Sequence, residues 1–158
     1  MALEGIRVLD LTWGGAGPFA TKALADHGAD VIKVETSTHY DFPRTTGPYA
    51  EGKKGINRST YFSNRNTSKR GITLNFKKPK AIELAKRLVR SCDLVVNNFR
   101  AGVMERMGLG YQDLALCHCL RQPLFVGSRS IEKLLDRERR VDQRDQPQPV
   151  RRRRQQHG

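Results

Sequence analysis

The chain has 158 residues, of which 37% are hydrophobic and 28% charged, and its formal net charge is +13. This length favours one globular domain, and the sequence holds no run of about 20 apolar residues that would predict a membrane-spanning helix. Three cysteines, an odd number without a framework spacing, fit a reducing compartment better than a disulfide scaffold. The N-terminus also lacks the layout of a signal peptide, so we expect a cytoplasmic protein.

The first 35 residues predict a β-α-β unit. Residues 6–11 form a short aliphatic run that stops at a glycine cluster, as a buried parallel strand does. Pro18 is well placed to open a helix that Gly28 closes, and residues 31–34 have the character of a second strand. Because such a unit has a right-handed crossover, we expect an α/β fold with a partial, Rossmann-like, doubly wound parallel sheet.

Residues 36–70 interrupt this pattern with Pro, Gly, Asn, Ser and Thr. The apolar pair Tyr61-Phe62 stands alone within this stretch. Such composition predicts a long surface excursion, and long loops of this kind often carry binding residues.

Strand and helix patterns resume after the excursion. The alternation of Ile72, Leu74 and Phe76 predicts a half-buried strand, and Pro79 opens a helix with apolar residues at helical spacing. Residues 94–96 then predict a further buried strand. A short helical stretch follows at 103–107, and glycines turn the chain again after it.

The composition changes after Leu114. Residues 1–114 hold 18 basic and 11 acidic side chains, whereas residues 115–158 hold 11 and 5 and include the block Arg151–Arg154. We therefore predict an N-terminal portion over 1–114 and an irregular, disordered, Arg- and Gln-rich basic tail over 115–158. A high-GC gene read out of frame gives such a composition, so a frameshift is our leading explanation, and an arm that binds nucleic acid is its rival.

The run Cys117-His118-Cys119 suggests metal binding at first sight. A zinc site needs four ligands at characteristic spacings, and the sequence offers no second pair nearby. We therefore expect reduced thiols and no metal site.

The glycine cluster has a nucleotide-binding interpretation and a structural one. Residues 15–20 fit the pattern G-x-G-x-x-A, and Glu35 lies where a ribose-binding acid would follow in an NAD-binding protein. Pro18 argues against a dinucleotide, because it removes one of the N–H groups that hold a pyrophosphate. In the structural interpretation the glycines only permit a tight turn and close helix packing.

Several separate motifs resemble one enzyme family. The stretches that carry the resemblance are 5–12, 16–18, 24–35, 61–62, 66–75 and 98–111. In order and spacing they resemble the N-terminal portion of class III CoA-transferases, which include the formyl-CoA and carnitine-CoA transferases. The group is also called the carnitine dehydratase and bile acid-inducible protein family. The resemblance covers residues 4–114.

The resemblance implies an α/β domain that binds coenzyme A beside the strand ends. Family members contact CoA with residues that match Gly15, Ala16, Leu74, Asn75, Phe76, Lys77, Asn98, Phe99, Arg100 and Arg106. These residue types suit the ligand, because Lys and Arg pair with phosphates and Phe99 offers an apolar face. In the structural alternative, Leu74 and Phe76 belong to the core, and Lys77 is a solvated side chain.

By the same resemblance the substrates are a CoA thioester and a carboxylic acid, and an aspartate attacks the thioester to form a mixed anhydride. No segment here matches that aspartate, and Asp136, Asp142 and Asp145 lie among charged and polar residues, so we assign catalysis to none of them. We expect a truncated transferase without turnover on its own, and without the interlocked homodimer of full-length members. The alternative function is nucleotide or nucleic-acid binding through the Gly15–Gly17 loop or Arg151–Arg154.

Overall fold

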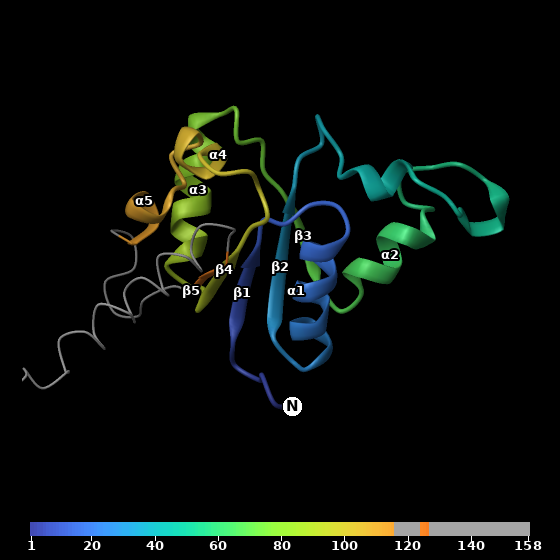
Figure 1. The fold of residues 1–158 in the computed structure, drawn as a ribbon, viewed down its shortest axis with the longest axis horizontal. Coiled ribbons are helices and arrows are strands. Elements are labelled where there is room, and N and C mark those ends of the chain that lie inside the picture. The colour runs from blue at the N-terminus through green and yellow to red at the C-terminus, as the bar shows by residue number, and fades with distance from the viewer. Residues whose placement is uncertain (116–123, 127–158) are drawn as a thin grey trace, which may run out of the picture.

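The computed structural model describes residues 1–115 and 124–126, and within them five parallel strands form one sheet in the order β3-β2-β1-β4-β5 (Figure 1). The strands are β1 (Arg7–Asp10), β2 (Asp30–Glu35), β3 (Arg70–Thr73), β4 (Leu94–Val96) and β5 (Leu124–Val126). β1 lies between β2 and β4, so the chain builds the sheet outward from β1 in both directions. The prediction of a Rossmann-like, doubly wound sheet is confirmed.

Helices cover both faces of the sheet. Figure 1 shows α1 (Ala16–Asp26) and α2 (Thr60–Asn66) on one side, and α3 (Pro79–Val89), α4 (Val103–Arg106) and α5 (Tyr111–Ala115) on the other. Successive strand residues point to opposite faces, so Val8 packs on the side of α1, whereas Leu9 packs on the side of α3. β1 and β2 are therefore buried nearly throughout, as expected for parallel strands covered on both faces, although Asp10 and Lys33 are charged.

The first β-α-β unit follows its prediction, with one shift at the start of the helix. α1 begins at Ala16, so Pro18 lies within its first turn instead of opening it. Proline is tolerated there, because the first N–H groups of a helix have no partner inside the helix. Gly28 follows the helix with a φ of +104°, a conformation that glycine adopts without strain.

The third strand is shorter than its alternating pattern predicted. β3 ends at Thr73, where its pairing with β2 ends opposite Glu35. Leu74 donates one more backbone hydrogen bond to Glu35 O at 2.8 Å, and the chain then turns toward α3. Leu74 and Phe76 still pack against the core, but they do so from the turn and not from the strand.

The excursion between β2 and β3 is more ordered than its composition predicted. It contains the short 3₁₀ turns η1 (Phe42–Thr45) and η2 (Ala50–Gly52) before α2. Ser59 caps α2, because its Oγ accepts a hydrogen bond from Phe62 N at 3.2 Å. A serine before a polar segment was the available signal for this helix.

β5 pairs in parallel with β4 and lies inside the segment predicted as an irregular tail, so the structure adds one strand there. Three sequence features lie outside the described residues: the Cys117-His118-Cys119 run, the block Arg151–Arg154, and the residues Asp136, Asp142 and Asp145. Among the helices that the structure describes, none is long and apolar enough to cross a membrane.

Candidate functional site

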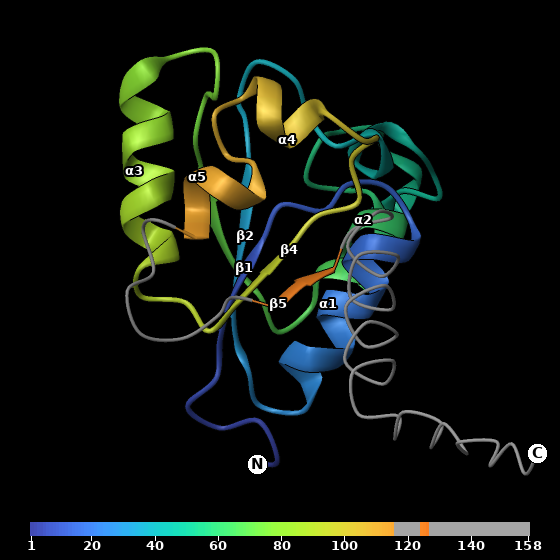
Figure 2. The same cartoon turned by 60° about the vertical axis from the view of Figure 1, so that its left-hand side comes forward.

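The loops that follow β1 and β4 meet at one end of the sheet (Figure 2). All strands run parallel, so their carboxyl ends share this edge. β1 pairs with β2 on one side and with β4 on the other, which makes the gap between the β1 and β4 loops a topological switch point. In open α/β sheets, ligands bind in the crevice at such a point.

Asn98 joins the two loops. Its Oδ1 accepts a hydrogen bond from Trp13 N at 2.9 Å, and its Nδ2 donates to Trp13 O at 2.7 Å. The next residue, Phe99, packs its ring against that of Trp13 at a centroid distance of 6.2 Å. The structure thus brings the predicted segment 98–100 against the loop that leads to the predicted residues Gly15 and Ala16.

The glycines of the first loop, which is residues 11–15 between β1 and α1, and of the first turn of α1 have distinct roles. Gly17 lies so close to the neighbouring loops that a Cβ would stand 2.6 Å from Thr12 Cβ and 2.9 Å from Asn98 Cγ. Gly14 has a φ of +82°, and a Cβ there would stand 2.9 Å from the ring of Phe42. These two positions support the structural interpretation of the glycine cluster. Gly15 is the N-cap of α1 and has more room, because a Cβ there would stand 3.4 Å from the Tyr61 hydroxyl oxygen.

The predicted residues 74–77 form the turn between β3 and α3. Asn75 Oδ1 accepts a hydrogen bond from Lys77 N at 3.0 Å, which stabilises the turn. Leu74 and Phe76 contact the core, in agreement with their structural alternative, while Lys77 is exposed. The turn follows β3, so it lies at the same edge of the sheet as the other predicted segments.

Arg100 and Arg106 are also exposed and lie in the segment after β4. Arg106 folds back toward the start of its short helix, because a Cβ at Gly102 would stand 3.3 Å from Arg106 Nη1. Its guanidinium therefore remains near the loop that carries Arg100. The structure leaves both side chains accessible to an anionic ligand.

The acidic residue that the dinucleotide interpretation requires, Glu35, is paired with another side chain. Glu35 forms a forked ion pair with Arg44, whose Nη2 lies 2.6 Å from Oε2 and whose Nε lies 3.0 Å from Oε1. The Arg44 guanidinium also lies 3.6 Å above the ring centroid of Phe62. A ribose hydroxyl would have to compete with Arg44 for this carboxylate.

A buried polar cluster on the α1 side of the sheet was missed by the sequence analysis. Asp10 Oδ2 accepts hydrogen bonds from Lys69 Nζ at 2.9 Å and from Thr21 Oγ1 at 2.6 Å. Burial lowers the pKa of Lys69, and the charge of Asp10 opposes this shift. Lys33 lies beside Asp10 in the paired register of β2 and β1. A lysine within the apolar run of residues 31–34 was the signal that pointed to this cluster.

Asp41 extends the cluster to the first loop. It is fully buried, and its Oδ1 accepts a hydrogen bond from Gly14 N at 2.8 Å. Its Oδ2 lies 3.5 Å from Lys33 Nζ, and Lys33 also donates to Thr12 O at 2.8 Å. Burial raises the pKa of Asp41, whereas the Gly14 hydrogen bond and the charge of Lys33 act in the opposite direction.

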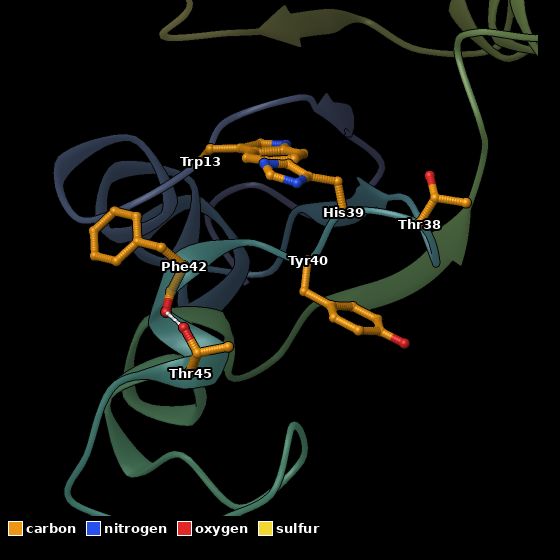
Figure 3. Close-up of a pocket in the computed structure, with 6 residues that line it drawn as sticks. All are labelled: Trp13, Thr38, His39, Tyr40, Phe42 and Thr45. Atoms are coloured by element: carbon orange, nitrogen blue, oxygen red, sulfur yellow. Dashed lines mark hydrogen bonds between the residues drawn. The ribbon is translucent and has the colours of Figure 1, made fainter.

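An aromatic pocket of about 470 Å³ opens beside the first loop (Figure 3). It is lined by Trp13, Thr38, His39, Tyr40, Phe42 and Thr45. The rings of Trp13 and His39 stack at a centroid distance of 5.5 Å and an interplanar angle of 21°. Trp13 thus belongs to the pocket and to the contact with the segment 98–100, although the sequence analysis did not select it.

Within 1–115 and 124–126, no group of three or more His, Cys, Asp or Glu side chains is arranged to hold a metal ion. Cys92 is buried in the core on the α3 side of the sheet.

Comparison with known proteins agrees with the resemblance noted in the sequence. The model of the CoA-transferase family III matches residues 3–118. Human succinyl-CoA:glutarate CoA-transferase is 46% identical over 112 residues, which are 71% of this chain and 25% of the human protein. Formyl-CoA:oxalate CoA-transferase of Rhodopseudomonas palustris is 44% identical over 113 residues, 72% of this chain and 26% of that protein. The chain thus spans about a quarter of the length of these curated relatives.

Solved structures that are similar to this chain agree with the family match. A CAIB/BAIF family protein from Brucella suis superposes with a TM-score of 0.69 at 37% identity, covering 79% of this chain and 32% of that chain. A protein from Mycobacterium tuberculosis superposes with a TM-score of 0.67 at 34% identity and the same coverage.

Proposed function

Because the chain belongs to the CoA-transferase family III, we propose that it is the CoA-binding portion of an enzyme that exchanges CoA between a thioester and a carboxylic acid. The proposed binding site is the edge where the β1 and β4 loops meet. It comprises Gly15, Ala16, the turn 74–77, the segment 98–100 and Arg106.

The observation that carries this proposal is the pair of hydrogen bonds between Asn98 and the backbone of Trp13. They fix the segment 98–100 against the loop before α1, at the position where α/β folds bind nucleotides. Lys77, Arg100 and Arg106 are exposed in the segments that follow β3 and β4. Such cations suit the phosphates of CoA, with Arg binding in forked geometry and Lys as a point charge.

Calorimetric titration of the 158-residue chain tests the site. CoA is expected to bind more tightly than NAD, because Glu35 is committed to Arg44. Arg106→Ala is expected to weaken CoA binding about tenfold, which is the usual effect of losing a charge-assisted hydrogen bond. Deletion of Arg151–Arg154 is the matched control and should leave the affinity unchanged. Tighter binding of NAD, or loss of all binding with this deletion, would exclude the proposed site.

We further propose that this polypeptide alone does not catalyse the exchange. Three acidic residues lie at or just beyond the carboxyl ends of β1 and β2, and all three are paired: Asp10 with Lys69, Glu35 with Arg44, and Asp41 with Lys33. A carboxylate paired with a cation is a poor nucleophile toward a thioester. An exchange assay with succinyl-CoA and glutarate should give no product above the uncatalysed rate, and sustained turnover would contradict this part.

A further inference from the structure

The loop after β1 is held by side chains from three different segments. Leu11 N donates to Val96 O at 2.8 Å, and beyond it the backbone leaves the sheet. The next three N–H groups each donate to a side-chain oxygen. Thr12 N donates to Asp10 Oδ1 at 2.9 Å, Trp13 N to Asn98 Oδ1 at 2.9 Å, and Gly14 N to Asp41 Oδ1 at 2.8 Å.

Asp41 is the acceptor that the excursion between β2 and β3 contributes. Its carboxylate is fully buried, and a buried charge is stable only when it is paired and hydrogen-bonded. Lys33 supplies the opposite charge at 3.5 Å and also holds Thr12 O at 2.8 Å. Lys33 and Asp41 therefore act together on the backbone on both sides of Trp13.

The segment that carries Asp41 is itself anchored. Arg44 pairs with Glu35 at the end of β2, and Ser59 Oγ contacts Pro43 O at 2.5 Å and Thr46 O at 2.6 Å. Phe42 lies against Gly14, where it leaves no space for a Cβ. The conformation of the first loop thus depends on where the η1 turn lies, because the Asp41 hydrogen bond and the Phe42 ring connect the two.

We propose that Asp41 is a positioning residue that holds the first loop in its CoA-binding conformation, with Lys33 as its charge partner. This inference rests on the proposed CoA site. Asp41 does not itself contact the ligand. It acts by fixing the Gly14 N–H, and thereby the conformation of the backbone that leads into Gly15 and Ala16.

The test compares two variants at position 41 with a control in the same segment. Asp41→Ala removes the acceptor, whereas Asp41→Asn retains an acceptor oxygen without the charge. Ser59→Ala is the control, because Ser59 is buried and holds the excursion but makes no hydrogen bond to the first loop. CoA affinity is measured by calorimetry, folding by circular dichroism, and the loop by the NMR signal of the Gly14 amide.

In Asp41→Ala we expect an upfield shift of the Gly14 amide proton and about a tenfold loss of CoA affinity, since a hydrogen bond to a charged group is lost. Asp41→Asn should show a smaller shift and recover most of the affinity. Ser59→Ala should lower the melting temperature with a smaller loss of affinity than Asp41→Ala, because it loosens the segment that carries Asp41 but leaves the hydrogen bond from Gly14 N to Asp41 in place. Trp13 is the single tryptophan of the chain, so its emission gives a second reading of the loop.

Two results would overturn the inference. One is an unchanged Gly14 amide in both variants at position 41. The other is a loss of affinity that follows the loss of stability equally in Asp41→Ala and Ser59→Ala. If Asp41→Ala does not fold, the inference is decided by Asp41→Asn alone, through the chemical shift of its Gly14 amide proton. A parent chain that binds no CoA would refute the proposed function, whereas the amide shift would still decide whether Asp41 fixes the loop.

Discussion

At Gly17 the first turn of α1 approaches Thr12 and Asn98 with no room for a side chain. Both neighbours are held in place. Thr12 Oγ1 donates to Asp10 Oδ1 at 2.5 Å, and Asn98 makes two hydrogen bonds to the Trp13 backbone. Neither side chain can move aside without losing hydrogen bonds that fix the first loop. The structural interpretation of this glycine therefore has a definite cause in the contact between two loops.

Gly17→Ala should for this reason destabilise the chain by about 1–3 kcal/mol through overpacking, although alanine is the better helix former. The free energy of unfolding from urea titration measures the effect. Gly71→Ala is the matched control, because a Cβ there meets nothing within 4 Å, and its cost should stay within about 0.5 kcal/mol. Equal stability of the two variants would show that the loops around Gly17 move apart to accommodate a methyl group without cost.

The pairing of the charged residues behind the first loop could not be predicted from the sequence. Lys33 interrupts an apolar strand and could be marked as unusual, but its partner Asp41 lies in an excursion whose path no periodicity predicts. Their contact depends on where the η1 turn packs. The resemblance selected Asn98, whereas Trp13, which Asn98 holds, was visible only in the folded chain.

Among the helices, α3 shows how an amphipathic pattern translates into packing. Its buried residues are Ala81, Ala85 and Val89, which recur at four-residue spacing and face the sheet. Ile82 and Leu88 flank this stripe and are half-buried. The apolar spacing therefore predicted the helix and its face correctly, and the small residues at its centre allow it to lie close to the strands.

Val89→Ala should lower the free energy of unfolding by about 1–2.5 kcal/mol, since Val89 is fully buried and its two methyl groups would leave a cavity. Arg87→Ala, an exposed position of the same helix, serves as the control and should cost no more than about 0.5 kcal/mol. Chemical denaturation of both variants measures the difference. Equal costs would mean that α3 does not pack on the sheet as described.

Two other elements departed from their patterns for tertiary reasons. β3 is an edge strand whose length is set by its pairing with β2, so the apolar alternation continued past the strand into the turn at 74–77. α2 carries few apolar residues and is stabilised by its Ser59 cap and by ring contacts, including Arg65 over Tyr61 at 3.7 Å. Periodicity finds helices that bury one face in a core, and α2 is not of that kind.

On the scale of the whole molecule, the doubly wound topology gathers every candidate segment at one edge. The order β3-β2-β1-β4-β5 places the β1 and β4 loops side by side and the β3 turn farther along the same edge. The repeated strand and helix patterns predicted the parallel sheet, and the family resemblance implied binding beside the strand ends, whereas the strand order was visible only in the structure. The chain spans about a quarter of the length of its curated relatives, and all of these segments lie within that quarter.

The central claim is that CoA binds at this edge, and amide chemical-shift mapping on the 158-residue chain tests it most directly. Titration with CoA should shift signals at residues 14–17, 74–77 and 98–106, because these segments lie at the carboxyl ends of β1, β3 and β4. NAD should shift the same signals less at equal concentration. Changes confined to residues 116–158, or none in the three segments at millimolar CoA, would contradict the account.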